Sequence, residues 1–125
     1  MQYNILGNKL ATCGSDGKIV IYDIDSGVIK KSNELVKHDG PIWRLSWAHS
    51  KFGNILASCS YDKSLIIWKE ISKNNWEEIY KFDHKESVNC ICFSPPEYGL
   101  LLLSVSSDGS VAVHEYNSNF NFNLS

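Results

Sequence analysis

The sequence predicts an all-β fold that is built from repeated units of four short strands. The first observation is a heptapeptide that occurs three times with similar chemistry: LATCGSD ends at Asp16, LASCSYD at Asp62 and LLSVSSD at Asp108. These aspartates lie 46 residues apart each time, and a fixed period of this size indicates an array of equivalent supersecondary units. The second observation is that no stretch shows a helical period, whereas short runs of β-forming residues recur between turn signals.

The strands of one unit can be assigned in order along residues 37–82. Three short runs are rich in β-branched, aromatic and other apolar side chains, and a fourth alternates polar and apolar residues; they cover residues 42–47, 55–60, 65–68 and 76–82. Polar turn-forming residues separate these runs. In the first and third units the central turn is Asp16 followed by Gly17 and Asp108 followed by Gly109. This dipeptide is a strong hairpin signal because glycine adopts positive φ without strain.

The repeat also predicts how the chain is divided. Residues 1–36 form a partial first unit, 37–82 a complete second unit, 83–116 a third unit without its last strand, and 117–125 an Asn-rich tail. This last segment is either disordered or a displaced strand. A four-stranded unit with this period matches the blade of a β-propeller. Propellers close with about 4–8 blades, so two and a half to three blades predict an incomplete ring. We expect a fragment, a truncated product, or a chain that another copy or a partner completes.

The second unit resembles a blade of the WD-repeat family in four residues, His38, Ser58, Asp62 and Trp68. The resemblance implies a structural tetrad in which the Asp orients the His, the His bonds the Ser, and the Ser bonds the indole N–H. Such a network satisfies polar groups that are buried. The other two units match this pattern in part, with Thr12, Asp16 and Tyr22 in the first and His84, Ser104, Asp108 and His114 in the third.

A longer string narrows the resemblance. Residues 38–62 read HDGPIWRLSWAHSKFGNILASCSYD, and IWKE follows at 67–70. The string is similar to the second blade of the Sec-thirteen family of WD-repeat propellers, which are subunits of the COPII outer coat and of the nuclear-pore Y-complex. Residues 10–13 resemble the first blade of that family, and residues 95–109 resemble the third. Two alternatives stay open: a Seh-one-like nucleoporin propeller and a generic WD-repeat adaptor that binds peptides.

The resemblance implies a non-catalytic scaffold in ER-to-Golgi transport. Its partner would be an α-solenoid protein, either a Sec-thirty-one-like coat protein or a Y-complex nucleoporin, which donates a blade to the open ring. The implied location is the cytosolic face of ER exit sites and COPII vesicles, or the nuclear pore, with membrane contact only through the coat. The candidate contacts for the donated blade are Ile19, Val20, Ile21 and Tyr22. Ile19 and Ile21 share one face of the strand and Val20 and Tyr22 the other; which pair meets the partner stays open, and packing between blades is the alternative for all four. Exposed blade faces also predict self-association.

Composition excludes several other functions. The net charge is −2, and the chain contains one arginine, Arg44, and eleven scattered lysines. This composition argues against nucleic-acid binding. The repeat aspartates recur in every unit, whereas a catalytic residue is expected to break the symmetry, so we expect no catalytic residue. No glycine-rich phosphate loop and no CxxC pair occur, so we expect neither a cofactor nor a metal. Trp43 and Arg44 are candidate peptide contacts on the top face, with packing as the alternative.

Overall fold

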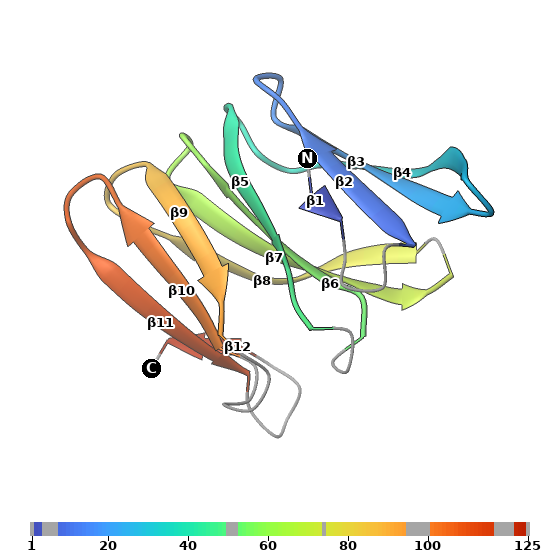
Figure 1. Cartoon of the computed structure of the whole chain (residues 1–125). Helices are drawn as coiled ribbons and strands as arrows, with labels where there is room; N and C mark the ends of the chain where they lie inside the picture. Colours follow the sequence, from blue (N-terminus) through green and yellow to red (C-terminus); the bar gives the residue numbers. More distant parts are fainter. Residues whose placement is uncertain are drawn as a thin grey trace.

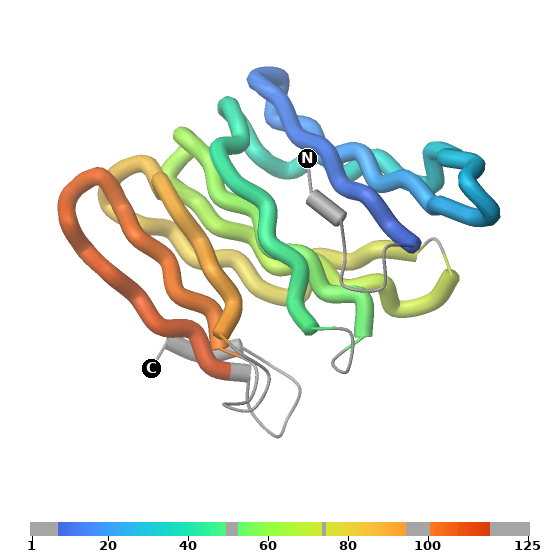
Figure 2. The backbone as a smooth tube through the Cα atoms, viewed as in Figure 1, coloured from blue at the N-terminus to red at the C-terminus, as the bar shows by residue number. Residues whose placement is uncertain are grey.

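Three four-stranded antiparallel sheets stand side by side in a computed structural model of the chain (Figure 1). The structure describes residues 2–3, 8–49, 53–73, 75–94, 101–116 and 122–124; for 2–3, 116 and 122–124 it describes the backbone alone. The sheets follow one another in chain order, from the blue to the orange part of the backbone (Figure 2). The predicted all-β class is thereby confirmed. Within the described ranges, no helix has the length and hydropathy needed to cross a bilayer.

In each sheet, strands that follow one another in the chain pair with each other. The first sheet contains β1 (Gln2–Tyr3), β2 (Lys9–Cys13), β3 (Lys18–Asp25) and β4 (Val28–Val36). The second contains β5 (Ile42–Trp47), β6 (Ile55–Ser60), β7 (Ser64–Ser72) and β8 (Asn75–Asp83). The third contains β9 (Val88–Phe93), β10 (Leu101–Ser106), β11 (Val111–Tyr116) and β12 (Phe122–Leu124).

The sheets share one register. Thr12 pairs with Val20 in the first sheet, Ser58 pairs with Ile66 in the second, and Ser104 pairs with Ala112 in the third. Each of these pairs lies 46 residues from the corresponding pair in the next sheet. The period of the sequence is therefore also a period of the hydrogen-bond ladders, and residues at equivalent positions face equivalent neighbours.

The hairpin between the second and third strands of each sheet depends on a residue with positive φ. Gly17 and Gly109 have φ of 77° and 85°, and in the second sheet Lys63 takes this conformation at 76°. Gly17 has a second constraint, because a Cβ atom there would lie 2.7 Å from the backbone oxygen of His38. In each turn the aspartate Oδ1 accepts a hydrogen bond from the backbone N–H two residues later, at 3.1, 2.9 and 2.9 Å. This bond is an Asx turn, and it fixes the orientation of the carboxylate.

The third sheet differs from the prediction. Residues 83–116 were expected to lack a last strand, but β12 pairs with β11 through His114 and Leu124, Glu115 and Asn123, and Tyr116 and Phe122. The segment that was assigned as a tail thus contributes the fourth strand. The Phe-Asn alternation in residues 120–123 has the period of two that a strand requires, and the asparagine content obscured this signal. The new strand has three residues, whereas β4 and β8 have nine each.

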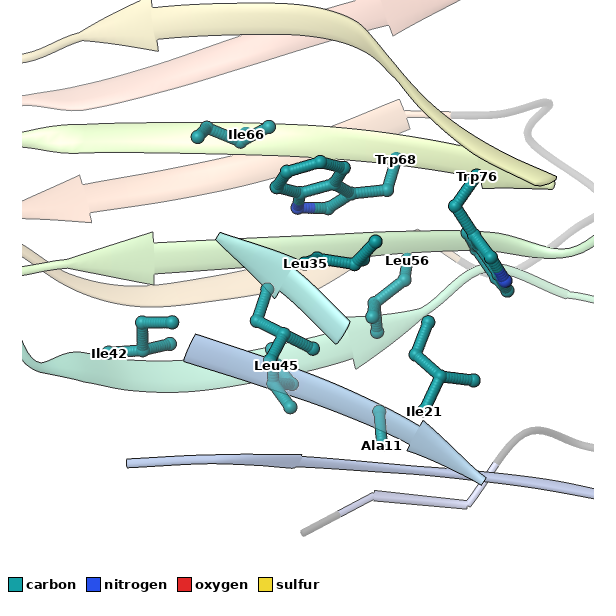
Figure 3. Packing of buried hydrophobic residues seen from close by; sticks show 10 residues of the cluster. Ala11, Ile21, Leu35, Ile42, Leu45, Leu56, Ile66, Trp68 and Trp76 are labelled. Atoms are coloured by element: carbon teal, nitrogen blue, oxygen red, sulfur yellow. The ribbon is translucent and has the colours of Figure 1, made fainter. Parts of the chain in front are cut away.

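Two apolar clusters hold the sheets together. One lies between the first and second sheets and the other between the second and third. The alternation along β6 and β7 supplies both clusters: Leu56 and Ile66 belong to the first, whereas Ala57 and Leu65 belong to the second. Figure 3 shows how side chains from both sheets meet in the first cluster. The strand β6 and residues 64–68 of β7 are buried throughout, because each neighbouring sheet covers one face of these inner strands.

The position of the first cluster shows which of the candidate contacts for a donated blade face the second sheet and which face away from it. Ile19 and Ile21 are fully buried and belong to the cluster that faces the second sheet. They pack against the second sheet, so this pair does not lie on the outward face of the first sheet. Val20 and Tyr22 alternate with them along β3 and are half-buried. Side chains alternate across a strand, so Val20 and Tyr22 lie on the face that points away from the second sheet.

Candidate functional site

Four residues from different parts of the second sheet form one hydrogen-bonded network. His38 precedes β5, Ser58 lies in β6, Asp62 lies in the turn after β6, and Trp68 lies in β7. His38 Nε2 lies 2.7 Å from Ser58 Oγ, and His38 Nδ1 lies 3.1 Å from Asp62 Oδ2. The indole N–H of Trp68 donates to Ser58 Oγ at 3.2 Å. The structure therefore brings together all four residues of the expected tetrad.

The protonation states of His38 and Asp62 decide which group donates each hydrogen bond of this network. Burial lowers the pKa of His38, although the neighbouring Asp62 opposes this effect. Burial alone would raise the pKa of Asp62, but hydrogen bonds from Ser64 and from the backbone N–H of Asp39 outweigh it and lower the pKa to about 2. A neutral His38 beside an ionised Asp62 donates from Nδ1 and accepts at Nε2. The Ser58 hydroxyl then donates to His38 and accepts from Trp68.

Ser64 is a fifth member of the network that sequence reasoning missed. Its hydroxyl donates to Asp62 Oδ1, and its oxygen lies 3.1 Å from His38 Nδ1. The signal was present in the sequence, since Ser110 occupies the same position 46 residues later. Ser110 has a related role, because its oxygen lies 3.3 Å from His84 Nδ1 and its backbone N–H donates to Asp108.

The third sheet contains a different version of the network. His84 Nε2 lies 2.8 Å from Ser104 Oγ, and Ser104 Oγ lies 3.0 Å from His114 Nε2. His114, at the position of the tetrad Trp, is 0% exposed. Its Nδ1 lies 2.9 Å from the hydroxyl of Tyr80, which belongs to β8 of the second sheet. This network therefore crosses from one sheet to the next.

Burial keeps His114 uncharged. Desolvation, with a further effect of the nearby His84, lowers the pKa of His114 to about 4. Burial also raises the pKa of Tyr80, so its hydroxyl keeps its proton and donates to His114 Nδ1. The other ring nitrogen, Nε2, then carries the proton and donates to Ser104, as an indole N–H would.

In the first sheet the network is not assembled. No hydrogen bond joins Thr12, Asp16 and Tyr22 to one another in the part of the chain that the structure describes. Among the residues that the structure describes, Asp16 bonds only with the backbone N–H of Lys18 in its own turn. A pocket of about 200 Å³ lies beside Thr12 and Asp16.

The candidate top-face contacts lie at the surface. Trp43 and Arg44 are both exposed, and Trp43 is 51% exposed. The ring of Trp43 meets Tyr61 edge to face, with 6.4 Å between ring centroids. Tyr61, in the turn between β6 and β7, is 62% exposed. The two aromatic rings thus form an exposed pair, and their role in binding stays a prediction.

Burial suppresses the thiolate form of two of the four cysteines. All four are free, and burial raises the pKa of Cys59 to about 12, which suppresses its thiolate. Burial also raises the pKa of Cys13. Among the described residues, no group of three or more His, Cys, Asp or Glu side chains is arranged to hold a metal ion.

Comparison with known proteins agrees with the geometry of the networks. The family model described as "WD domain, G-beta repeat" matches residues 29–69 and 76–115. The chain belongs to the WD-repeat family. It is 47% identical over 119 residues to "Protein SEC13 homolog" of Drosophila melanogaster, a match that covers 91% of this chain and 32% of that protein.

Fungal WD-repeat relatives show the same similarity. The chain is 43% identical over 122 residues to "Protein transport protein sec13" of Emericella nidulans, which covers 90% of this chain and 40% of that protein. It is 40% identical over 125 residues to the protein of that name from Cryptococcus neoformans, with 90% and 38% covered. The chain spans between about a third and two-fifths of the length of these curated relatives.

The WD repeats are offset from the sheets by one strand. The first matched range begins in β4 of the first sheet and continues through β5, β6 and β7 of the second. The second range covers β8 of the second sheet and β9, β10 and β11 of the third. Each WD repeat therefore contains one complete His-to-Trp or His-to-His network, and each also spans a boundary between two sheets.

Proposed function

We propose that this chain is a non-catalytic scaffold module of the COPII vesicle coat, which acts in protein transport from the ER to the Golgi. The observation that carries the proposal is the similarity to proteins named for protein transport, at 43% identity over 90% of this chain in Emericella nidulans. The corresponding location is the cytosolic face of ER exit sites, and the chain reaches the membrane only through its partners.

The engagement of the polar residues supports a structural role. The three turn aspartates make the same bond to the backbone in all three sheets. The two tetrad histidines, His38 and His84, are buried and each contacts a buried serine. Polar groups that are hydrogen-bonded within the fold, with the same geometry in successive sheets, stabilise the structure rather than take part in catalysis.

The surfaces of the outer sheets fit a protein partner. Leu103, Val105 and Val111 of the third sheet are exposed apolar side chains, and Val20 and Tyr22 lie on the outward face of the first sheet. Neighbouring apolar side chains at the surface favour association with another protein. The proposed partner is a Sec-thirty-one-like α-solenoid protein that adds β structure beside the first sheet.

Exposure of Trp43 and Tyr61 favours a second candidate function, a WD-repeat adaptor that binds peptides. Exposed aromatic side chains frequently anchor protein and peptide ligands. In this case the edge-to-face pair would be the contact, and Arg44 beside it would favour an acidic peptide.

One binding experiment tests both functions. The chain is co-purified with the coat solenoid, and the variants Tyr22→Ala and Tyr61→Ala are compared. Scaffold binding predicts that Tyr22→Ala weakens the complex about tenfold or more, whereas Tyr61→Ala leaves it unchanged. The reverse pattern would favour the adaptor. No complex with the coat solenoid, together with a stable complex with a Y-complex nucleoporin, would move the scaffold to the nuclear pore.

A further inference from the structure

A groove lies between one end of the first sheet and one end of the second. It is bounded by the hairpin of β3 and β4 and by the turn between β7 and β8, which lie near each other in Figure 1. Two adjoining hollows of about 570 and 600 Å³ form this groove. The hollows share the lining residues Asp23, Asp25 and Lys73, so they are parts of one groove.

The charged groups in the deepest part of the groove bind one another. Nζ of Lys9 lies 2.6 Å from Asp23 and 3.5 Å from Glu70. Glu70 also accepts a hydrogen bond from Nδ2 of Asn54 at 2.8 Å. The side chains of Lys9 and Glu70 are each 11% exposed. These groups therefore satisfy one another within the fold, and a ligand in the groove has to be held by other residues.

Two lysines at the edge of the groove come from different sheets. Lys30 lies on β4 of the first sheet, and Lys73 lies in the turn between β7 and β8 of the second. Both side chains are exposed. Within the described ranges, no carboxylate oxygen lies within 4 Å of Nζ of either residue. Lys31 also lines the groove, but its Nζ lies 3.0 Å from Glu34.

A single carboxylate at the edge of the groove opposes these two cations. Asp25 comes before the turn of the β3–β4 hairpin, and its Oδ1 accepts a hydrogen bond from the hydroxyl of Ser26 at 3.3 Å. Among the residues that the structure describes, it has no ion pair with a lysine. The charges that remain for a ligand are thus those of Lys30, Lys73 and Asp25, and they sum to one positive charge.

We propose that this groove binds the phosphate group of a phosphate monoester, with Lys30 contributed by the first sheet and Lys73 by the second. Such a group carries a charge of about −1.5 to −2 at neutral pH and has three acceptor oxygens, so it can interact with both lysines at once. A lysine ammonium binds phosphate as a point charge. A carboxylate carries one charge and is therefore expected to bind less well. The proposal does not depend on the coat function, because it concerns the ligand chemistry of the groove.

The site is tested with inorganic phosphate and with phosphoserine capped as acetyl and methylamide. Each is titrated into the ¹⁵N-labelled chain at about pH 7.5, where the phosphate is mostly a dianion, and at constant ionic strength. We expect saturable shifts of the backbone amides of Lys30 and Lys73, with a dissociation constant of about 1–10 mM for a site with two exposed lysines. Tighter binding of capped phosphoserine assigns the site to a phosphorylated protein segment, whereas tighter binding of inorganic phosphate assigns it to the free ion.

Four variants of exposed residues locate the phosphate. Lys73→Met should weaken binding about threefold, since it removes one of the two charges, whereas Lys73→Arg should preserve binding. Lys37→Met, the matched change of an exposed lysine that does not line the groove, should leave the affinity unchanged. Asp25→Asn should act in the opposite direction and strengthen the binding of inorganic phosphate about twofold, because it removes a charge of the same sign as the ligand.

Three results would overturn the proposal. The absence of saturable shifts at Lys30 and Lys73 would show that the groove does not bind phosphate. Equal weakening by Lys73→Met and Lys37→Met would show that phosphate responds only to the net charge of the chain. Capped glutamate that binds as tightly as capped phosphoserine would show that the groove accepts any acidic group and has no preference for phosphate.

Discussion

Tyr80 donates a hydrogen bond to His114 across the boundary between the second and third sheets, with 2.9 Å between the hydroxyl oxygen and Nδ1. The bond exists because a histidine stands where the second sheet has Trp68. An indole has a single polar atom, whereas an imidazole has two, so the second ring nitrogen requires a partner that the third sheet alone does not supply. Tyr80 of the neighbouring sheet supplies it.

Tyr80→Phe should therefore destabilise the fold. The change leaves Nδ1 of a buried ring unpaired, which costs about 1–3 kcal/mol. Urea unfolding monitored by circular dichroism measures the effect. Tyr61→Phe is the matched control, because Tyr61 is exposed and its hydroxyl is accessible to water. Equal effects of the two changes would show that the bond between the sheets contributes little.

The stability of the chain should fall in mild acid because of His114. Its pKa of about 4 in the folded chain lies below the value of about 6.5 for an unfolded histidine. The unfolded chain therefore binds more protons between these values, and the free energy of unfolding decreases as the pH falls from about 6.5 to about 4. The loss attributable to His114 is about 3 kcal/mol or less.

The effect can be assigned to the residue by comparing unfolding at about pH 7 and pH 4.5. His114→Gln should flatten the dependence. Asp62 does not interfere, since its pKa of about 2 confines its contribution to a lower range of pH. A steep dependence that survives in His114→Gln would place the effect on other groups, with His38 and His84 as the next candidates.

Ser58 is the residue at which two hydrogen bonds of the second sheet meet. Ser58→Ala removes the acceptor of the Trp68 indole and the hydroxyl that contacts His38. All three residues are buried, so we expect a loss of about 2 kcal/mol or more in the free energy of unfolding. Ser72→Ala, at the exposed end of the neighbouring strand, should change the free energy by less than about 0.5 kcal/mol. Similar losses in both variants would contradict the role of the network.

Lys9 links the first two sheets by ion pairs. Its Nζ lies 2.6 Å from Asp23 in the first sheet and 3.5 Å from Glu70 in the second, and the residue is 9% exposed. Lys9→Met should destabilise the chain by about 1–3 kcal/mol, since it leaves Glu70 largely buried without this cation. Lys31→Met, which removes an exposed pair with Glu34, should cost less than about 1 kcal/mol. Thermal unfolding of the two variants at equal ionic strength compares them.

The three hairpin turns provide a matched series for backbone strain. Gly109→Ala forces a side chain into positive φ without a clash, at a cost of about 1 kcal/mol. Gly17→Ala carries the same strain and also a contact of 2.7 Å with the backbone of His38, so it should cost clearly more. Lys63→Gly should be neutral or stabilising, because Lys63 already adopts this conformation. Equal costs at Gly17 and Gly109 would show that the segment at His38 moves away easily.

The sequence predicts well what depends on neighbours along one sheet. The Asp-Gly turns and the strands between them follow from local chemistry and from the period, whereas the tetrad from His38 to Trp68 follows from the resemblance to WD-repeat blades. The contact between Tyr80 and His114 was not predictable in this way, because the two residues belong to different sheets and the pairing departs from the repeat. The sequence left the segment of β12 open between a tail and a strand, because its alternation is short and its polar residues resemble those of a loop.

For the candidate site, too, the sequence predicted which residues alternate along a strand but not which residues contact the neighbouring sheet. Ile19 and Ile21 could not be separated from Val20 and Tyr22, since alternation assigns two faces but does not say which of them meets the next sheet. Packing decided this, through the cluster shared with the second sheet. Ser64 was overlooked although it recurs as Ser110, because its role requires knowledge of how the aspartate carboxylate is oriented.

The offset of one strand between the WD repeat and the sheet has a consequence for how such chains lengthen. A gene duplication that copies one period of 46 residues adds an outer strand to the existing sheet and three inner strands to a new one. Every new sheet is then joined to its predecessor by covalent bonds as well as by packing. An array of this kind therefore grows by whole periods without leaving an unmatched strand at any internal junction.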